Sequence, residues 1–123
     1  MKNIGFQTLG NDELTKVCDI EEIMENECIN IKIAKGKKQK SIFAVKKNGG
    51  FFVYLNSCPH IGTPLNLIPN KFLSHNDNHI ICSTHGALFE IETGFCIAGP
   101  CINKSLIKIP AAIKNNALFI KIP

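Results

Sequence analysis

The chain has 123 residues, the size of one ordinary domain, and 45% of them are hydrophobic, which is enough for a core. Charged residues make up 20% and the formal net charge is +4, so the protein is mildly basic and its charge gives little support for nucleic-acid binding. No stretch reaches the about 18 consecutive apolar residues of a membrane span, and the N-terminus has no apolar segment of the secretory kind. We therefore expect a cytoplasmic protein without a nucleic-acid or membrane partner, whose six cysteines are thiols or metal ligands more than disulfides.

The N-terminal part of the chain predicts one short strand and one short helical segment. The strand is expected at residues 16–18. Asp19 is a good helix cap, and Glu21 and Glu22 suit a first turn, so one or two helical turns are expected to follow. This segment is too short to organise a fold.

Three consecutive strands are predicted next. Apolar and polar residues alternate over 28–34, which indicates a half-buried strand. Residues 41–45 are rich in strand-forming side chains, and residues 51–55 are nearly all apolar, so the third strand is expected to be buried on both faces. Asn48-Gly49 supplies the positive φ values that a tight hairpin turn requires.

Two cysteine–histidine pairs follow apolar strands. Cys58 and His60 come after the third strand, and Cys82 and His85 come after a short strand expected at 80–81. Each pair is followed by a glycine, which lets the backbone turn tightly and approach a bound group closely. Loops of this kind must be held by a sheet beneath them if they are to converge on one site.

The segments around the second pair predict short strands and turns. Prolines make residues 63–69 irregular, and a further short strand is expected at 71–73, before a polar turn at 74–79. Strands at 87–91 and 94–97 are expected to bracket another tight turn.

The chain is predicted to close with a hairpin of residues 106–109 and 117–122, joined through Asn115-Asn116. Many short strands with regularly spaced turns indicate an all-β fold, either a sandwich or a small barrel.

Two thiols and two imidazoles make a set of four metal ligands. Zinc takes four ligands in tetrahedral geometry, but zinc modules usually group cysteine with cysteine and histidine with histidine. Here each turn carries one ligand of each kind. This mixed pairing favours a [2Fe–2S] centre in which two histidines replace two cysteines on one iron, and zinc is the weaker alternative.

These residues carry a family resemblance. The segments C-P-H-I-G-T-P-L at 58–65 and C-S-T-H-G-A-L-F at 82–89 resemble the cluster-binding loops of Rieske [2Fe–2S] proteins, and the likeness continues through G-F-C-I-A-G-P at 94–100. The resemblance implies one [2Fe–2S] cluster, with Cys58 and Cys82 on one iron and His60 and His85 on the other. It also implies that Gly99-Pro100 belongs to a proline loop covering the cluster.

The resemblance further implies how the chain is divided. Similar proteins have an antiparallel β-sandwich or barrel base with an inserted cluster-binding subdomain. In this chain the subdomain would span about residues 57–101, and the base would comprise about residues 1–56 plus 102–123, all within one Rieske-type domain.

In its departures from the respiratory branch of the family, this chain resembles the soluble Rieske ferredoxins. The respiratory proteins have a disulfide where this chain has Thr63 and Thr84, and hydroxyl donors where it has Ala87 and Phe89. Hydrogen bonds to the cluster sulfurs raise the potential, so their absence predicts the low end of the Rieske range, of order −150 mV.

The resemblance implies a one-electron carrier and not an enzyme. Such a ferredoxin would accept electrons from a reductase and pass them to a terminal oxygenase. The alternative functions are an accessory subunit of a larger reductase, of the nitrite reductase small-subunit type, and a zinc-stapled interaction module. The sequence indicates no oligomeric state.

The remaining histidines and cysteines carry weaker expectations. His75 and His79 flank a polar Asn-Asp-Asn turn and are expected to be turn residues, not a second metal site. Cys96 and Cys101 could form a redox pair, but buried thiols beside the cluster loop are the expected interpretation. Cys18 and Cys28 are given no role.

Overall fold

The computed structural model describes residues 7–9, 14–35, 38–59 and 62–121. Within these ranges the chain forms three antiparallel sheets and one short 3-10 helix, which confirms the all-β prediction. The elements are β1 (Gln7–Leu9), β2 (Leu14–Asp19), η1 (Ile20–Glu22), β3 (Cys28–Lys35), β4 (Lys38–Lys47), β5 (Gly50–Leu55), β6 (His79–Ile81), β7 (Leu88–Glu90), β8 (Cys96–Ala98), β9 (Ala111–Lys114) and β10 (Ala117–Lys121). No helix in the described ranges has the length and apolar character needed to cross a membrane.

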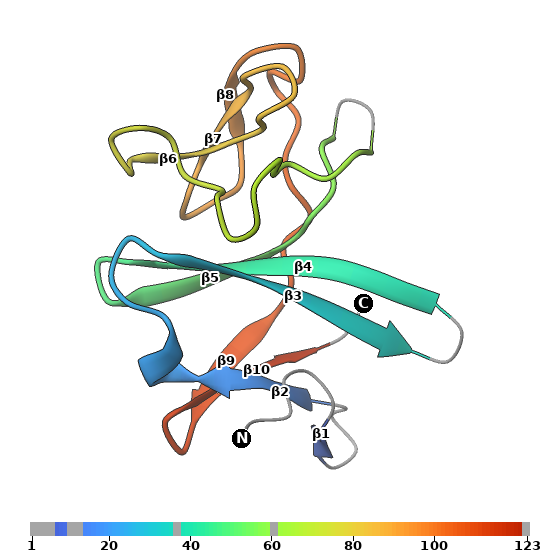
Figure 1. The fold of residues 1–123 in the computed structure, drawn as a ribbon, viewed down its shortest axis with the longest axis vertical. Coiled ribbons are helices and arrows are strands. Elements are labelled where there is room, and N and C mark those ends of the chain that lie inside the picture. The colour runs from blue at the N-terminus through green and yellow to red at the C-terminus, as the bar shows by residue number, and fades with distance from the viewer. Residues whose placement is uncertain (1–6, 10–13, 36–37, 60–61, 122–123) are drawn as a thin grey trace.

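The middle sheet, β3-β4-β5, is covered on both faces. Its strands alternate side chains between two separate cores, as a pleated strand must. One core contains Phe43, Val45 and Tyr54, and the other contains Ile42, Ala44 and Val53. Figure 1 shows the consequence: this sheet lies between the small sheet β6-β7-β8 at the top and the sheet β1-β2-β10-β9 at the bottom. The prediction that residues 51–55 are buried on both faces is confirmed by this arrangement, although Phe51, Phe52 and Leu55 are only partly buried.

Both predicted Asn-containing hairpin turns are present, at Asn48-Gly49, where the sequence predicted positive φ values, and at Asn115-Asn116. Asn48 and Gly49 have φ of 52° and 78° and join β4 to β5, and Asn115 and Asn116 have φ of 51° and 61° and join β9 to β10. These are the left-handed values that a two-residue hairpin needs. The short helical segment after Asp19 is also present, as η1.

The first arm of the terminal hairpin was predicted wrongly. It is β9, Ala111–Lys114, and not residues 106–109. Residues 106–109 instead run beside β5, where the Leu55 N–H donates to the Ile107 carbonyl and the Ile109 N–H donates to the Val53 carbonyl, each at 2.9 Å. This extended segment carries the chain from the upper sheet to the lower one in Figure 1, and its alternating apolar residues fill both cores: Leu106 lies in one and Ile109 in the other.

The small sheet is less regular than the sequence suggested. The strand expected at 71–73 is reduced to a single bridge between Leu73 and Ile80, and the polar turn ends one residue early because His79 already belongs to β6. Strand β6 leads directly into Cys82, as β5 leads toward Cys58. The first predicted ligand loop therefore follows β5 of the middle sheet, and the second follows β6 of the small sheet.

Candidate metal centre

The two predicted ligand loops, residues 58–63 and 82–87, share one backbone hydrogen-bonding pattern. In the first loop the Cys58 N–H donates to the Thr63 carbonyl at 2.7 Å, and the Gly62 N–H donates to the Cys58 carbonyl at 2.7 Å. In the second loop the Cys82 N–H donates to the Ala87 carbonyl at 2.9 Å, and the Gly86 N–H donates to the Cys82 carbonyl at 2.8 Å. Each loop is thus closed by the same pair of hydrogen bonds around its cysteine.

A glycine four residues after each cysteine makes this closure possible. Gly62 has φ of 80° and Gly86 has φ of 73°, a region that residues with a Cβ rarely adopt. Both glycines have open space around a hypothetical Cβ, so the backbone angle, and not crowding, accounts for them. The glycine that the sequence places after each cysteine–histidine pair therefore shapes the loop.

The structure brings the two predicted thiol ligands together. Cys58 and Cys82 are 2% and 0% exposed, and both belong to the same buried core. His85 lies at the surface, and His60 lies outside the described residues. In the part of the chain that is described, no group of three or more His, Cys, Asp or Glu side chains is arranged to hold a metal ion.

The surroundings of Cys82 act on its thiol in opposite directions. Burial raises its pKa above the ordinary value, and the neighbouring Cys58 thiol raises it further, whereas the backbone N–H groups of Thr84 and His85 lower it. N–H groups near a sulfur favour its charged form, so the loop backbone favours a thiolate at this position. A thiolate is the form in which cysteine binds metal, so this donor set fits a thiolate-ligated group.

Asn56, two residues before Cys58, was not singled out from the sequence. It is 7% exposed, and its Oδ1 accepts from the Leu65 N–H at 2.8 Å. Its Nδ2 donates to the Asn66 Oδ1 at 2.9 Å and to the Ser41 Oγ at 3.2 Å. A buried polar side chain with partners in two other segments, β4 and residues 65–66, fixes the chain as it enters the first loop. A polar residue at the end of an apolar strand was the available signal.

The second loop is supported by close backbone packing. A Cβ added to Gly99 would lie 2.7 Å from the Ala87 Cα, and Gly99 has φ of 101°. The Ser83 N–H also donates to the Leu65 carbonyl at 2.8 Å. The Gly99-Pro100 turn therefore lies directly against the second ligand loop, which is compatible with its predicted role as a cover.

Cys96 and Cys101 are buried thiols beside the predicted ligands. Both are 0% exposed, and their sulfurs are 3.3 Å apart. Burial raises the pKa of the Cys101 thiol to about 12, and the neighbouring thiols of Cys96 and Cys58 add to this effect. Since Cys58 and Cys82 belong to the same core, four thiols gather here.

The four residues at which this chain departs from the respiratory Rieske pattern have two kinds of environment. Thr63 and Thr84 are exposed. Ala87 and Phe89 are 0% exposed and lie in the core that contains Cys58. Neither Ala87 nor Phe89 has a side-chain donor that could reach a sulfur.

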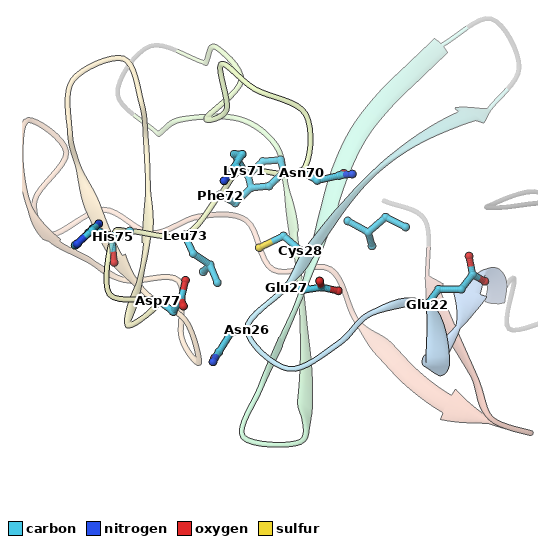
Figure 2. A pocket seen from close by; sticks show the side chains of 12 residues that line it. Glu22, Asn26, Glu27, Cys28, Asn70, Lys71, Phe72, Leu73, His75 and Asp77 are labelled. Atoms are coloured by element: carbon cyan, nitrogen blue, oxygen red, sulfur yellow. The ribbon is translucent and has the colours of Figure 1, made fainter.

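A pocket of about 570 Å³ lies away from these thiols, between the start of β3 and residues 70–77 (Figure 2). Figure 2 shows the Cys28 sulfur at its centre, between Glu27 and Phe72. Burial raises the pKa of the Cys28 thiol to about 12. His75 is exposed on the turn at its rim, and His79 begins β6, so the two histidines are not presented on a helix.

Comparison with known proteins identifies the family to which the sequence is similar. The profile of the Rieske [2Fe–2S] domain matches residues 13–115. A relative from Pseudomonas putida, the ferredoxin component of a p-cumate 2,3-dioxygenase system, is 27% identical over 122 residues, covering 99% of this chain and 96% of its own length. Human apoptosis-inducing factor 3 is 29% identical over 105 residues, which is 85% of this chain, and the chain spans only 16% of that relative's length.

The fold is also found among solved structures. The ferredoxin of carbazole 1,9a-dioxygenase from Nocardioides aromaticivorans superposes with a TM-score of 0.68 at 14% identity. The superposition covers 89% of this chain and 98% of that one. At this level of identity the likeness concerns the fold alone.

Proposed function

Because the chain belongs to the Rieske [2Fe–2S] domain family, we propose that it is a one-electron carrier whose cluster is held by Cys58, His60, Cys82 and His85. When bound, the [2Fe–2S] cluster takes up and releases one electron. The chain itself is an electron-transfer protein and not a catalyst, since electron carriage needs only a bound redox group and access for partners.

The observation that carries the proposal is the meeting of Cys58 and Cys82. Two loops with the same hydrogen-bonding pattern place two neighbouring thiols in one buried core, while His85 of the second loop stays at the surface. Buried sulfur and exposed imidazole suit the two tasks of an electron carrier. The sulfur side is kept from water, and the imidazole side faces a docking protein.

The chain's residues have separate roles in this proposal. Cys58 and Cys82 would supply the thiolates, and the N–H groups of Thr84 and His85 would stabilise the charge on the Cys82 sulfur. Replacing two thiolates by neutral imidazoles leaves the first shell less negative, which raises the potential above that of an all-cysteine centre. The apolar Ala87 and Phe89 provide no hydrogen bond that would raise it further.

We propose a reductase as the electron donor and a terminal oxygenase as the acceptor. The support is the full-length relative, which is a ferredoxin component of a dioxygenase system and matches this chain almost end to end. Relatives of which this chain is only a small part are weaker guides to its partners.

Purification and anaerobic reconstitution with iron and sulfide test this function. We expect a reddish-brown protein with two irons per chain, reversibly reduced by one electron and re-oxidised by an electron acceptor. Cys58→Ser and His85→Ala should each lose the spectrum, whereas the surface change His75→Ala should keep it. A colourless protein that binds one zinc would contradict the proposal, and tight co-purification with a large reductase would favour the accessory-subunit alternative.

A further inference from the structure

A second pocket, of about 390 Å³, lies where the chain enters and leaves the first ligand loop. One side includes Asn56, two residues before Cys58, and Pro64, which directly follows the loop. The other side is formed by residues of β3 and β4. The pocket therefore adjoins the first ligand loop, although none of the proposed cluster ligands lines it.

The pocket lies on the face of β3 and β4 that also carries the core of the small sheet. Lys32 is paired with Ser41 across the two strands, so their side chains lie on one face. Ser41 and Phe43 alternate onto that same face of β4, and Phe43 belongs to the core that contains Cys58. Figure 1 shows the end of β3 and the start of β4 extending beyond the small sheet, which leaves this part of the face uncovered.

The Ser41 hydroxyl has a proton for which the described part of the chain offers no acceptor. Its Oγ accepts from the Asn30 Nδ2 at 2.9 Å and from the Asn56 Nδ2 at 3.2 Å. Both amides are oriented by other bonds: the Asn30 Nδ2 also donates to the Ile42 carbonyl, and the Asn56 Oδ1 accepts from the Leu65 N–H. A hydroxyl has two acceptor lone pairs and one proton. With both lone pairs in use, Ser41 can act only as a donor toward a further group.

The charge around this donor is positive. Lys32 and Gln39 are exposed at the pocket, and Lys40 also borders it. Among the described residues no acidic side chain lines the pocket, and neither lysine forms an ion pair. An ammonium group, an amide N–H and a hydroxyl proton are all donors, so the matching ligand is a negatively charged acceptor.

We propose that this pocket receives a carboxylate of an acidic redox partner, which accepts hydrogen bonds from Ser41 and Lys32 and holds the partner beside the first ligand loop. The proposal rests on the proposed function and extends it by naming a docking contact. A side chain presented by a partner suits the site better than a free small molecule. Small-molecule sites bury about 70–90% of their ligand, whereas Lys32, Gln39 and Pro64 are exposed. The formal charge of +4 also favours an acidic partner.

Titration of the loaded, oxidised protein with a short peptide that carries two aspartates, followed by nitrogen-15 NMR, tests the site. The backbone signals of residues 32, 39 and 41 should shift, and the same peptide with asparagine in place of aspartate should shift none of them. Lys32→Gln should weaken binding about two- to fivefold, as the loss of one exposed ion pair does. Ser41→Ala should weaken it about tenfold, because a hydrogen bond to a charged group is lost. Ser41→Thr keeps the hydroxyl and should bind like wild type.

Lys114→Gln is the matched control, because Lys114 is an exposed lysine of β9 in the sheet β1-β2-β10-β9. It should bind the peptide like wild type. The proposal would be overturned by unshifted signals at residues 32, 39 and 41, by equal binding of the asparagine peptide, or by equal weakening in Lys32→Gln and Lys114→Gln. Inorganic phosphate is the probe for a free-anion site, and tighter binding of phosphate than of the peptide would overturn the docking role. If Ser41→Ala does not fold, Lys32→Gln and the asparagine peptide still decide.

Electron exchange gives a second readout that a merely structural role would not move. Reduction of the oxidised protein by the hydroquinone of an acidic flavodoxin should be about two- to fivefold slower in Lys32→Gln at low salt, and the difference should shrink at high salt. An uncharged small-molecule reductant should reduce both proteins at the same rate, and equal slowing with it would overturn the proposal. If the wild-type chain shows no reversible one-electron reduction, the proposed function fails and the docking role with it. A reversible couple without peptide binding overturns the docking role alone.

Discussion

The two ligand loops have the same backbone closure but different supports. Both place a cysteine at the start and a left-handed glycine four residues later. The chain enters the first loop through Asn56, whose side chain makes hydrogen bonds to three residues, Ser41, Leu65 and Asn66. The second loop packs closely, through Ala87, against the backbone of Gly99. The conformation of each loop is therefore set by its own local hydrogen bonds, whereas its position is set by longer-range contacts that differ between the two loops.

This difference teaches where each half of the site is vulnerable. The hydrogen bonds of Asn56 are lost when its side chain is truncated, and the close packing of Gly99 on Ala87 is disrupted when a side chain is added at Gly99. Variants of the two kinds should damage the two loops selectively. The predictions below run from the largest expected effect to the smallest.

Gly99→Val should have the largest effect. The new Cβ would meet the Ala87 Cα at 2.7 Å, and a β-branched residue is strained at φ of 101°. Overpacking costs about 1–3 kcal/mol and backbone strain about 1–3 kcal/mol, so we expect a loss of about 3–5 kcal/mol in urea unfolding. Gly49→Val is the matched control, because Gly49 has φ of 78° and nothing within 4 Å of a hypothetical Cβ. Equal losses in the two variants would show that packing on the second loop is unimportant.

Asn56→Ala should be next in size and should act on the first loop. It leaves the buried Leu65 N–H without its acceptor and removes two further hydrogen bonds. An unsatisfied buried group costs about 1–3 kcal/mol, so we expect about 2–3 kcal/mol and faster loss of the cluster on dilution into chelator. Asn66→Ala removes only one of these bonds and should cost less. An Asn56→Ala variant as stable as wild type would contradict the supporting role of this side chain.

Tyr54→Phe tests whether the two loops depend on one another. Tyr54 lies on β5, which leads to the first loop, and its hydroxyl donates to the Ile91 carbonyl at 2.5 Å, beyond the second loop. Losing this bond should cost about 1–2 kcal/mol. If thermal unfolding is unchanged, the two loops are not joined through this contact.

The same residue gives a pH dependence. Burial raises the pKa of Tyr54 to about 12, with a smaller contribution from Glu92. Because the folded pKa lies above the ordinary value of 10, this group's contribution to stability is fully present below pH 10 and falls as the pH rises through 12. The stability of wild type should therefore drop more steeply over this range than that of Tyr54→Phe. Parallel curves would contradict the assignment.

Ala87→Ser and Phe89→Tyr should have the smallest effects, both on the potential and not on the fold. Each adds a hydroxyl at a buried position of the core that contains Cys58. A hydrogen bond of about 0.5–1.5 kcal/mol corresponds to an increase of about 20–60 mV for one electron. Mediated titration checks this. A potential that falls or stays constant in both variants would contradict the explanation of the low value.

Much of this structure could be predicted because its signals are local. Alternation of polarity and the Asn-Gly turn specified β3, β4 and β5, and the two cysteine–histidine pairs specified the loops. Residues 106–109 were misplaced because their alternation is equally compatible with a hairpin arm and with a strand-like crossing between two cores. Only the long-range pairing with β5 distinguishes these possibilities.

The supports of the site were not predictable for a related reason. Asn56 is an ordinary polar residue in the sequence, and its partners at Ser41 and Asn66 are distant from it along the chain. The Tyr54 hydroxyl and its acceptor, the Ile91 carbonyl, are separated by 37 residues. Such contacts depend on how the sheets are stacked, which residue spacing does not encode.

Electron paramagnetic resonance of the reduced protein, combined with nitrogen-15 labelling of histidine, tests the central claim most directly. Mixed ligation by Cys58, Cys82, His60 and His85 predicts one unpaired electron per chain. It also predicts an average g-value below that of all-thiolate clusters and couplings to two histidine nitrogens. An average g-value of the all-thiolate kind, or no histidine coupling, would contradict the claim.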